Sequence, residues 1–212
     1  MRILITICLL TACLAGCSNT LPIVEWEDGY IPYYYTGSFT SDDIQTIESA
    51  MTAWESVCGV QFEEVIPRSD AYNIIRVKKS TEWASSVGEN NIHNHMYYGD
   101  GYDAYSHTLH ELGHCLGLLH EHQRPDRDYY VTIVWSNILP EYDYNFYIED
   151  NPLIRESDYA YDFKSIMSYN IQAFSINGED TIIPVQPIER SDKLSDTDIA
   201  KAQAIYGSPV GN

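Results

Sequence analysis

Basic side chains are scarce in this chain of 212 residues, which carries 12 Lys and Arg against 31 Asp and Glu. The formal net charge of −19 at pH 7 gives a surface that on average repels nucleic-acid phosphates and anionic membrane surfaces. Nucleic acid is therefore excluded as a partner. The acidity otherwise suits an exported protein that must stay soluble.

Cysteine is also scarce, and the positions of the five cysteines imply no disulfide framework. Cys8 and Cys13 lie within an N-terminal apolar segment, and Cys17 directly follows that segment. Only Cys58 and Cys115 remain in the rest of the chain. We expect Cys115 to be a small buried apolar residue, and the stability of the fold to come from packing alone.

An apolar run long enough to cross a bilayer is absent. The run Ile3–Leu14 follows a single Arg and leads into Leu-Ala-Gly-Cys, which is the pattern of a secretory signal. This ending resembles a bacterial lipobox, which implies that residues 1–16 are a lipoprotein signal peptide and that Cys17 carries a lipid. The protein would then be exported and anchored to a membrane on the extracytoplasmic side, at the outer membrane or the cell surface. The alternative is a cleaved secretory signal with an incidental Cys17.

No internal repeat or low-complexity linker divides the remaining chain, whose length suits one domain. We expect a tether at 17–25, a folded domain at 26–207 and a short C-terminal tail at 208–212.

The first half of the domain has the patterns of a sheet with helices. Apolar periodicity predicts a helix that begins at Ser41, with acidic residues favourably placed in its first turn. Strands are expected at Ile31–Tyr35, Val60–Ile66, Asn73–Lys78 and His95–Tyr98.

The apolar periodicity of the sequence weakens in the second half of the domain. Tyr129–Trp135 is expected to be extended and residues 138–163 to be irregular. A final helix is predicted at Asp196–Tyr206, with Ser195 as its N-cap and Asp198 in a capping box. An ordered sheet-and-helix lobe followed by a loop-rich lobe that ends in a helix is an α+β arrangement.

Residues 110–121 read HELGHCLGLLHE and predict a metal site. His110 and His114 lie four residues apart, so their imidazoles share one face of a helix and can bind one zinc ion. His120 would point about 80° away from them on a continuing helix, so the helix must end before it. Gly117 stands where this turn is required, because glycine reaches positive φ freely.

The chemistry of these residues favours hydrolysis. Three neutral imidazoles leave the fourth position of zinc open for water, whose pKa the metal lowers toward about 7. Glu111 can accept the proton of that zinc-bound water and pass it to a leaving amine. A surface helix carboxylate is the alternative for Glu111.

The longer pattern HExxHxxGxxH followed by a Met-turn is the metzincin signature, and it is far more specific than HExxH alone. Met167, in the run Ser-Ile-Met-Ser-Tyr, supplies a candidate Met-turn. A methionine that only fills the core is the alternative.

The finer resemblance is to the astacin family. It rests on Glu121 after the third histidine, on the run HQRPDRDYYVTI that follows, and on TAWESVCGVQF, SSVG, DFKSIMSY and DTIIPVQ elsewhere. The resemblance covers residues 26–207. It implies a metzincin-like, two-lobed zinc protease that has an N-terminal twisted sheet with two long helices, a loop-rich C-terminal lobe ending in a helix, and a cleft between the lobes.

The same resemblance assigns roles to single residues. His110, His114 and His120 would bind one catalytic zinc ion, with Glu111 as the general base. Tyr169 matches a family tyrosine that resembles a fifth zinc ligand in the resting enzyme. In the reaction, this tyrosine would stabilise the tetrahedral oxyanion. A buried, hydrogen-bonded tyrosine is the alternative for this residue.

The sequence gives only a weak indication of substrate specificity. Some astacins, which this chain resembles, share a basic residue near the final helix. That residue selects substrates with acidic side chains just after the scissile bond. Arg190 or Lys193 could take this role.

The chain departs from the family pattern at several positions. Ser168 stands where astacins commonly have His, which puts one contact behind the zinc ligands in doubt. Cys58 matches a family cysteine whose partner is missing. Astacins tend to pair the glutamate after the third histidine with the freed mature N-terminus, which a lipidated Cys17 cannot supply. Glu121 is therefore expected to pair with a basic side chain or a water network, and latency by a pro-segment is not expected.

We therefore expect a lipid-anchored, monomeric, zinc-dependent endopeptidase that hydrolyses proteins or peptides outside the cytoplasm. A non-catalytic, metal-containing binding or adhesion lipoprotein is one alternative, and a zinc hydrolase acting on cell-wall peptides is another. The three histidines together with Glu111 and Tyr169 favour the enzyme. The acidic surface disfavours binding to anionic wall polymers.

Overall fold

The computed structural model describes residues 23–67, 73–89, 94–99, 101, 103–190 and 192–209. The signal peptide expected at 1–16 and the lipid expected on Cys17 lie outside the described residues. Val24 forms an isolated antiparallel bridge with Glu89, so pairing with the folded part begins two residues before Trp26.

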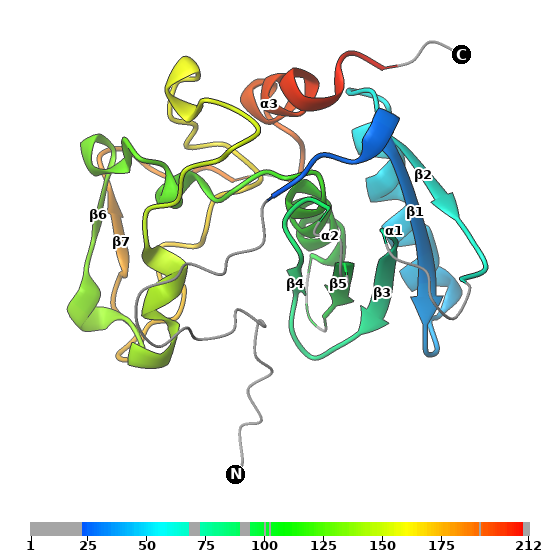
Figure 1. Ribbon diagram of the computed structural model, residues 1–212. Coiled ribbons are helices and arrows are strands. Elements are labelled where there is room, and N and C mark those ends of the chain that lie inside the picture. Colours follow the sequence, from blue (N-terminus) through cyan, green and yellow to red (C-terminus); the bar gives the residue numbers. More distant parts are fainter. Residues whose placement is uncertain are drawn as a thin grey trace, which may run out of the picture.

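A five-stranded sheet forms the N-terminal lobe, with the strand order β2-β1-β3-β5-β4 (Figure 1). All neighbouring strands are parallel except β4, which is an antiparallel edge strand on β5. Four strands confirm the predicted ones with ends shifted by one or two residues, whereas two-residue β4 has no period that a sequence could show. Their bounds are β1 Tyr30–Thr36, β2 Gln61–Glu64, β3 Ile75–Lys79, β4 Ala84–Ser85 and β5 Asn94–Tyr98.

Two long helices, α1 (Ser41–Glu55) and α2 (Ala104–Cys115), pack against each other and against the sheet. A capping box begins α1, since Thr40 and Asp43 each donate a backbone N–H to the other's side chain at 2.9 and 3.2 Å. The indole N–H of Trp54 donates to the carbonyl oxygen of Leu109 at 3.1 Å and joins the two helices.

The main hydrophobic core lies between the sheet and these helices. Side chains along β3 and β5 alternate between buried and partly exposed, so one face of the sheet is covered. The fully buried members of this core are Ile31, Ile47, Ala50, Trp54, Cys58, Ile75, Val77, Met96, Leu112, Leu116, Ile166 and Ala202.

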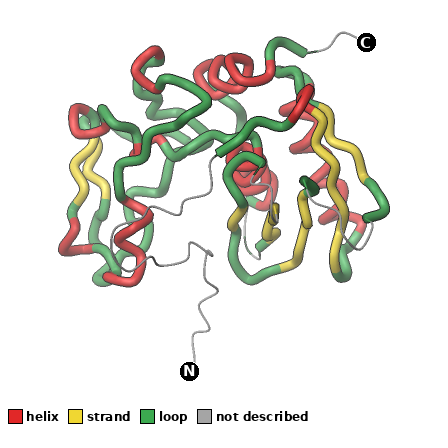
Figure 2. Tube along the Cα trace, viewed as in Figure 1, coloured by secondary structure: helices red, strands yellow, loops and turns green. Residues whose placement is uncertain are grey.

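The C-terminal lobe is built mainly from loops and short 3₁₀ turns (Figure 2). Its two-stranded antiparallel sheet consists of β6 (Val131–Ile133), which is shorter than expected, and β7 (Ile182–Pro184), which was not expected. The irregular character predicted for 138–163 is confirmed. A second, aromatic-rich core holds this lobe together and contains Val131, Ile138, Phe146, Tyr161, Phe163 and Ile182.

The 3₁₀ turns of the described chain are Glu27–Gly29, Glu121–Gln123, Arg127–Tyr129, Trp135–Asn137, Pro140–Phe146 and Glu156–Asp158.

The last helix, α3 (Asp196–Tyr206), returns the chain to the main core (Figure 1). Its predicted capping box is confirmed, because Ser195 and Asp198 exchange backbone-to-side-chain hydrogen bonds. The hydroxyl of Tyr206 donates to the carbonyl oxygen of Leu116 at 3.1 Å, just beyond α2. Among the described residues, no helix has the length and apolar character that a bilayer crossing requires.

Candidate zinc site

The helix α2 ends where the spacing of the histidines requires it to end. Its last residue is Cys115, and Gly117 follows with a φ of +94°. The Gly117 N–H donates to the carbonyl oxygen of His114 at 2.7 Å. Beyond this turn the backbone of His120 is extended, so its side chain comes back toward the helix.

The three imidazoles converge through their Nε2 atoms. The Nε2 of His120 lies 3.2 Å from that of His110 and 3.0 Å from that of His114. Among the described residues, these three histidines form the one group whose ligand atoms lie close enough together to hold a metal ion.

The opposite nitrogen of each ring is held by an oxygen that can only accept a hydrogen bond. These acceptors are the carbonyl oxygens of Ile166 at 2.7 Å and Leu118 at 2.8 Å, and the side-chain amide oxygen of Gln123 at 2.7 Å. Each Nδ1 must therefore carry the proton, which leaves a lone pair on each Nε2. Lone pairs 3.0 Å apart repel one another unless a cation lies between them. The donor set thus fits a zinc ion.

The protonation state of the histidines also fits a metal site. Burial lowers the pKa of His114 to about 4. Burial lowers the pKa of His110 and His120 well below the usual value, and the neighbouring imidazoles add to this shift. All three rings are neutral at physiological pH, which is the form that binds metal.

Glu111, the candidate general base, directly follows His110 on α2. Its side chain is buried, and its Oε2 has no hydrogen-bond partner. Burial raises the pKa of Glu111 to about 7, against the opposing effects of the Ser85 hydroxyl and Arg190. Ser85 on the edge strand β4 also donates to the backbone oxygen of Glu111 at 2.9 Å, which ties α2 to the sheet edge.

Met167 lies under the helix that carries the first two imidazoles. A Cβ added at Gly113 would lie 2.5 Å from the Met167 sulfur, so only glycine allows this approach. The carbonyl oxygen of Met167 accepts the N–H of Glu121 at 3.3 Å, directly after the third imidazole.

Tyr169 lies against the third imidazole. Its ring centroid is 4.1 Å from that of His120 and 4.4 Å from that of His122. His122 is buried, and its Nε2 lies 2.9 Å from the carbonyl oxygen of Asn145. Neither His122 nor Gln123 is among the site residues predicted from the sequence, although Gln123 stands three residues after His120, at the spacing of a capping box.

The two basic candidates for specificity lie in different surroundings. Arg190 is mostly buried, and its guanidinium donates to the hydroxyl of Ser106 at 3.3 Å and to the carbonyl oxygen of Ser168 at 3.4 Å. Its Nε is buried without a hydrogen-bond partner. Lys193 is exposed. Arg190 therefore bridges α2 and the Met-turn.

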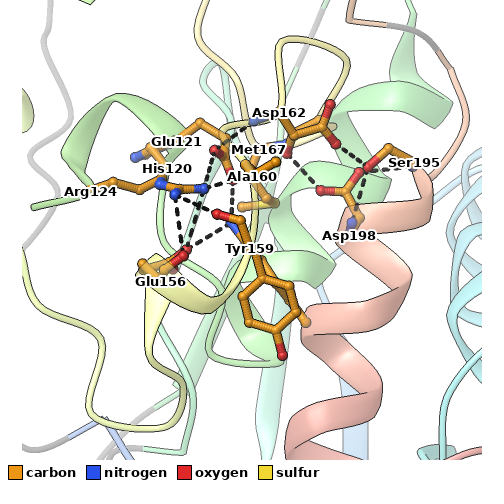
Figure 3. A network of polar contacts seen from close by, with 12 residues as sticks. His120, Glu121, Arg124, Glu156, Tyr159, Ala160, Asp162, Met167, Ser195 and Asp198 are labelled. Carbon is orange, nitrogen blue, oxygen red and sulfur yellow. Dashed lines mark hydrogen bonds and ion pairs between the residues drawn. The ribbon is translucent and has the colours of Figure 1, made fainter. Parts of the chain in front are cut away.

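Glu121 lies in a buried network of charges (Figure 3). Its Oε2 accepts from Arg124 Nη1 at 3.1 Å and from the backbone N–H of Asp162 at 3.2 Å. Its Oε1 contacts the Nζ of Lys201 on α3, which also lies 2.8 Å from Glu156 Oε2. The pKa of Lys201 is raised above its usual value. Burial opposes this shift, but the attraction of the Glu121 and Glu156 carboxylates outweighs burial. The expectation that Glu121 pairs with a basic side chain is confirmed.

The fold and this site together define a zinc metallopeptidase domain. The profile described as Astacin (Peptidase family M12A) matches residues 18–207, and the chain belongs to this astacin family. It is 35% identical over 182 residues to High choriolytic enzyme 1 of Oryzias latipes, covering 83% of this chain and 65% of that protein. It is 34% identical over 202 residues to Bone morphogenetic protein 1 of Xenopus laevis, covering 91% of this chain but only 28% of that protein.

The structural comparison agrees with the sequence comparison. The solved structure of High choriolytic enzyme 1, a hatching enzyme zinc-protease from Oryzias latipes, is similar with a TM-score of 0.75 and 31% sequence identity. The match covers 93% of this chain and 100% of that chain. The structure of myroilysin is similar in fold, with a TM-score of 0.56 and 21% identity.

Proposed function

We propose that the protein is a zinc-dependent endopeptidase that hydrolyses peptide bonds of extracytoplasmic proteins or peptides. The observation that carries this proposal is the convergence of three Nε2 lone pairs at the helix that also carries the buried, unpaired carboxylate oxygen of Glu111. Its support from relatives comes from proteins that are mostly longer than this chain, which spans 65% of one and 28% of another.

His110, His114 and His120 would hold the zinc ion, which as a Lewis acid polarises the peptide carbonyl and lowers the pKa of water. Glu111 accepts a proton from the attacking water through its Oε2 and delivers that proton to the leaving amine. Burial raises the pKa of Glu111, which favours its holding the proton between the two transfers.

The deciding experiment compares casein cleavage and zinc content in the wild type, a chelated sample and Glu111→Gln. We expect Glu111→Gln to bind zinc normally and to lose about 10²–10⁴-fold in kcat, because the amide cannot accept a proton. Chelation should abolish cleavage, and added zinc should restore it. Wild-type cleavage by a zinc-loaded Glu111→Gln would refute the mechanism, and no cleavage by the wild type would favour a non-catalytic binding protein.

Tyr169 is proposed as the donor to the developing oxyanion. The contact between its ring and the ring of His120, with centroids 4.1 Å apart, supports this role. We expect Tyr169→Phe to lower kcat by about 10²-fold or more with zinc content and KM nearly unchanged. An unchanged kcat would leave Tyr169 with a packing role only.

Arg190 is proposed, ahead of Lys193, to select acidic side chains just after the scissile bond. Its unpaired Nε and its contacts with both α2 and the Met-turn support the choice. Cleavage of a peptide library by wild type, Arg190→Ala and Lys193→Ala tests it. A preference after the cut that persists in Arg190→Ala would reject this assignment.

We also propose that the protein is exported and anchored to a membrane through a lipid on Cys17. The support is the sequence of residues 1–17 alone. Membrane fractionation of wild type and Cys17→Ala tests the anchor, with a metabolically incorporated fatty-acid probe as the chemical readout. Equal membrane association of both forms, with no label on the wild type, would reject it.

A further inference from the structure

The helix α3 contacts both segments that flank the third imidazole. Asp198 accepts a hydrogen bond from the hydroxyl of Ser165 at 2.6 Å and from the N–H of Ile166 at 2.9 Å, which fixes the start of the Met-turn. Lys201 lies three residues later, on the same face of α3, and contacts Glu121. Both side chains are buried. One helix face thus holds the Met-turn and the third-ligand segment in place.

A short chain of contacts leads from Lys201 to the metal-binding atoms. Glu121 is covalently joined to His120, and its N–H donates to the carbonyl oxygen of Met167 at 3.3 Å. The carboxylate of Glu121 lies on the network that Figure 3 shows running from Arg124 to Asp162, with Ser195 of the α3 cap also in contact with Asp162. A shift of this carboxylate would therefore shift the imidazole beside it.

The charges of the network make the ammonium necessary. Glu121 and Glu156 are both buried, with side chains 1% and 3% exposed. The guanidinium of Arg124 also pairs with Asp126, whose Oδ1 lies 2.9 Å from its Nε. Without Lys201, one guanidinium would face three carboxylates, and two of these have little access to water. The carboxylate of Glu121 would be driven away from its present position.

We propose that Lys201 is a positioning residue of the zinc site, which holds His120 in its metal-binding position by fixing the Glu121 carboxylate. This inference rests on the proposed zinc site. It differs from the roles of the histidines and Glu111, because the contacts of Lys201 are with the carboxylates of Glu121 and Glu156. It acts on the one imidazole that lies outside the helix.

The test measures metal binding in Lys201→Met, which keeps the length of the side chain and removes its charge. Zinc affinity is measured by competition with a chromophoric chelator, and cobalt(II) is added in place of zinc to record the d–d absorption of the site. We expect zinc affinity to fall about 10–100-fold, as for other residues that support metal ligands, and the cobalt spectrum to change. Lys79→Met is the matched control, because Lys79 pairs with Asp43 at 2.8 Å in the other lobe.

A second variant keeps the test decisive if the uncompensated charge prevents folding of Lys201→Met. Lys201→Met with Glu121→Gln removes both members of the pair and should fold, as judged by circular dichroism, but it should still bind zinc at least about 10-fold more weakly. Wild-type zinc affinity and an unchanged cobalt spectrum in the folded variant would overturn the proposal. Metal binding is measured without substrate, so a protein that binds zinc in this Lys201-dependent way but cleaves nothing would refute only the proposed function.

Discussion

His110 and His114 stand on a regular helix inside the main core, whereas His120 stands on an irregular segment at the border of the C-terminal lobe. The first two are fixed by helix geometry and by packing against the sheet. The third is fixed by Gln123 on one side and by the buried charges around Glu121 on the other. A single metal site thus depends on two kinds of stabilisation.

The difference extends to the lobes themselves. Backbone ladders and aliphatic packing dominate the N-terminal lobe. In the C-terminal lobe, buried arginine side chains donate to backbone carbonyl groups of loops and short 3₁₀ turns. Arg124 donates to the carbonyl oxygens of Glu156, Tyr159 and Ala160 at 2.9–3.2 Å, and Arg127 donates to that of His122 at 2.9 Å. In this lobe, hydrogen bonds from arginine side chains to backbone carbonyl groups hold the loops in place.

The largest effect is therefore expected from Arg124→Met in the C-terminal lobe. The side chain is 1% exposed, and its loss removes one of the two cations that face the buried carboxylates of Glu121 and Glu156, together with the donor to three backbone carbonyl groups. We expect the free energy of unfolding in urea to fall by about 3–5 kcal/mol. Arg155→Met is the control, because Arg155 is 77% exposed in its pair with Asp158 and should cost less than about 1 kcal/mol. Equal losses in the two variants would contradict the stabilising role of the buried arginine in this lobe.

A cavity in the N-terminal lobe should cost less and should leave the metal site intact. Ile47 on α1 is fully buried in the main core. We expect Ile47→Ala to lower the free energy of unfolding by about 2–4 kcal/mol while zinc affinity stays at the wild-type value. Ile176→Ala, at a side chain that is 55% exposed, is the control. A matching loss of zinc affinity in Ile47→Ala would show that the site depends on both lobes alike.

The turn between the two regions can be tested at Gly117. Its φ is +94°, and an added Cβ would lie 2.6 Å from Leu153 Cδ1. We expect Gly117→Ala to lower the free energy of unfolding by about 1–3 kcal/mol and to weaken zinc binding, because the turn delivers His120. Gly37 has a similar φ of +98° but open space around it, so Gly37→Ala measures the backbone strain alone. No difference between the two variants would mean that the contact with Leu153 is relieved without cost.

The same division explains what the sequence could predict. Periodicity revealed α1 and α3 together with four strands, and the spacing of the three histidines required the break at Gly117. Contacts between residues far apart in the chain leave no period, so the pairing of Lys201 with Glu121 across 80 positions could not be located. The sequence indicated only that Glu121 needs another partner, either a basic side chain or a water network. Gln123 was within reach of a local rule, whereas β7 is three residues long and pairs with a strand about 50 positions away.

The smallest effects should come from the two helix caps, which sharpen the comparison because they share one motif. Thr40 caps α1 at the surface, whereas Ser195 caps α3 and its hydroxyl also contacts Asp162 in the network beside Glu121. Each alanine variant loses one capping bond and should cost about 1 kcal/mol in the free energy of unfolding. Ser195→Ala should also weaken zinc binding slightly, since Asp162 donates its N–H to Glu121, while Thr40→Ala should not. Chelator competition on both variants decides the point, and an equal zinc affinity would mean that Ser195 acts only as a helix cap.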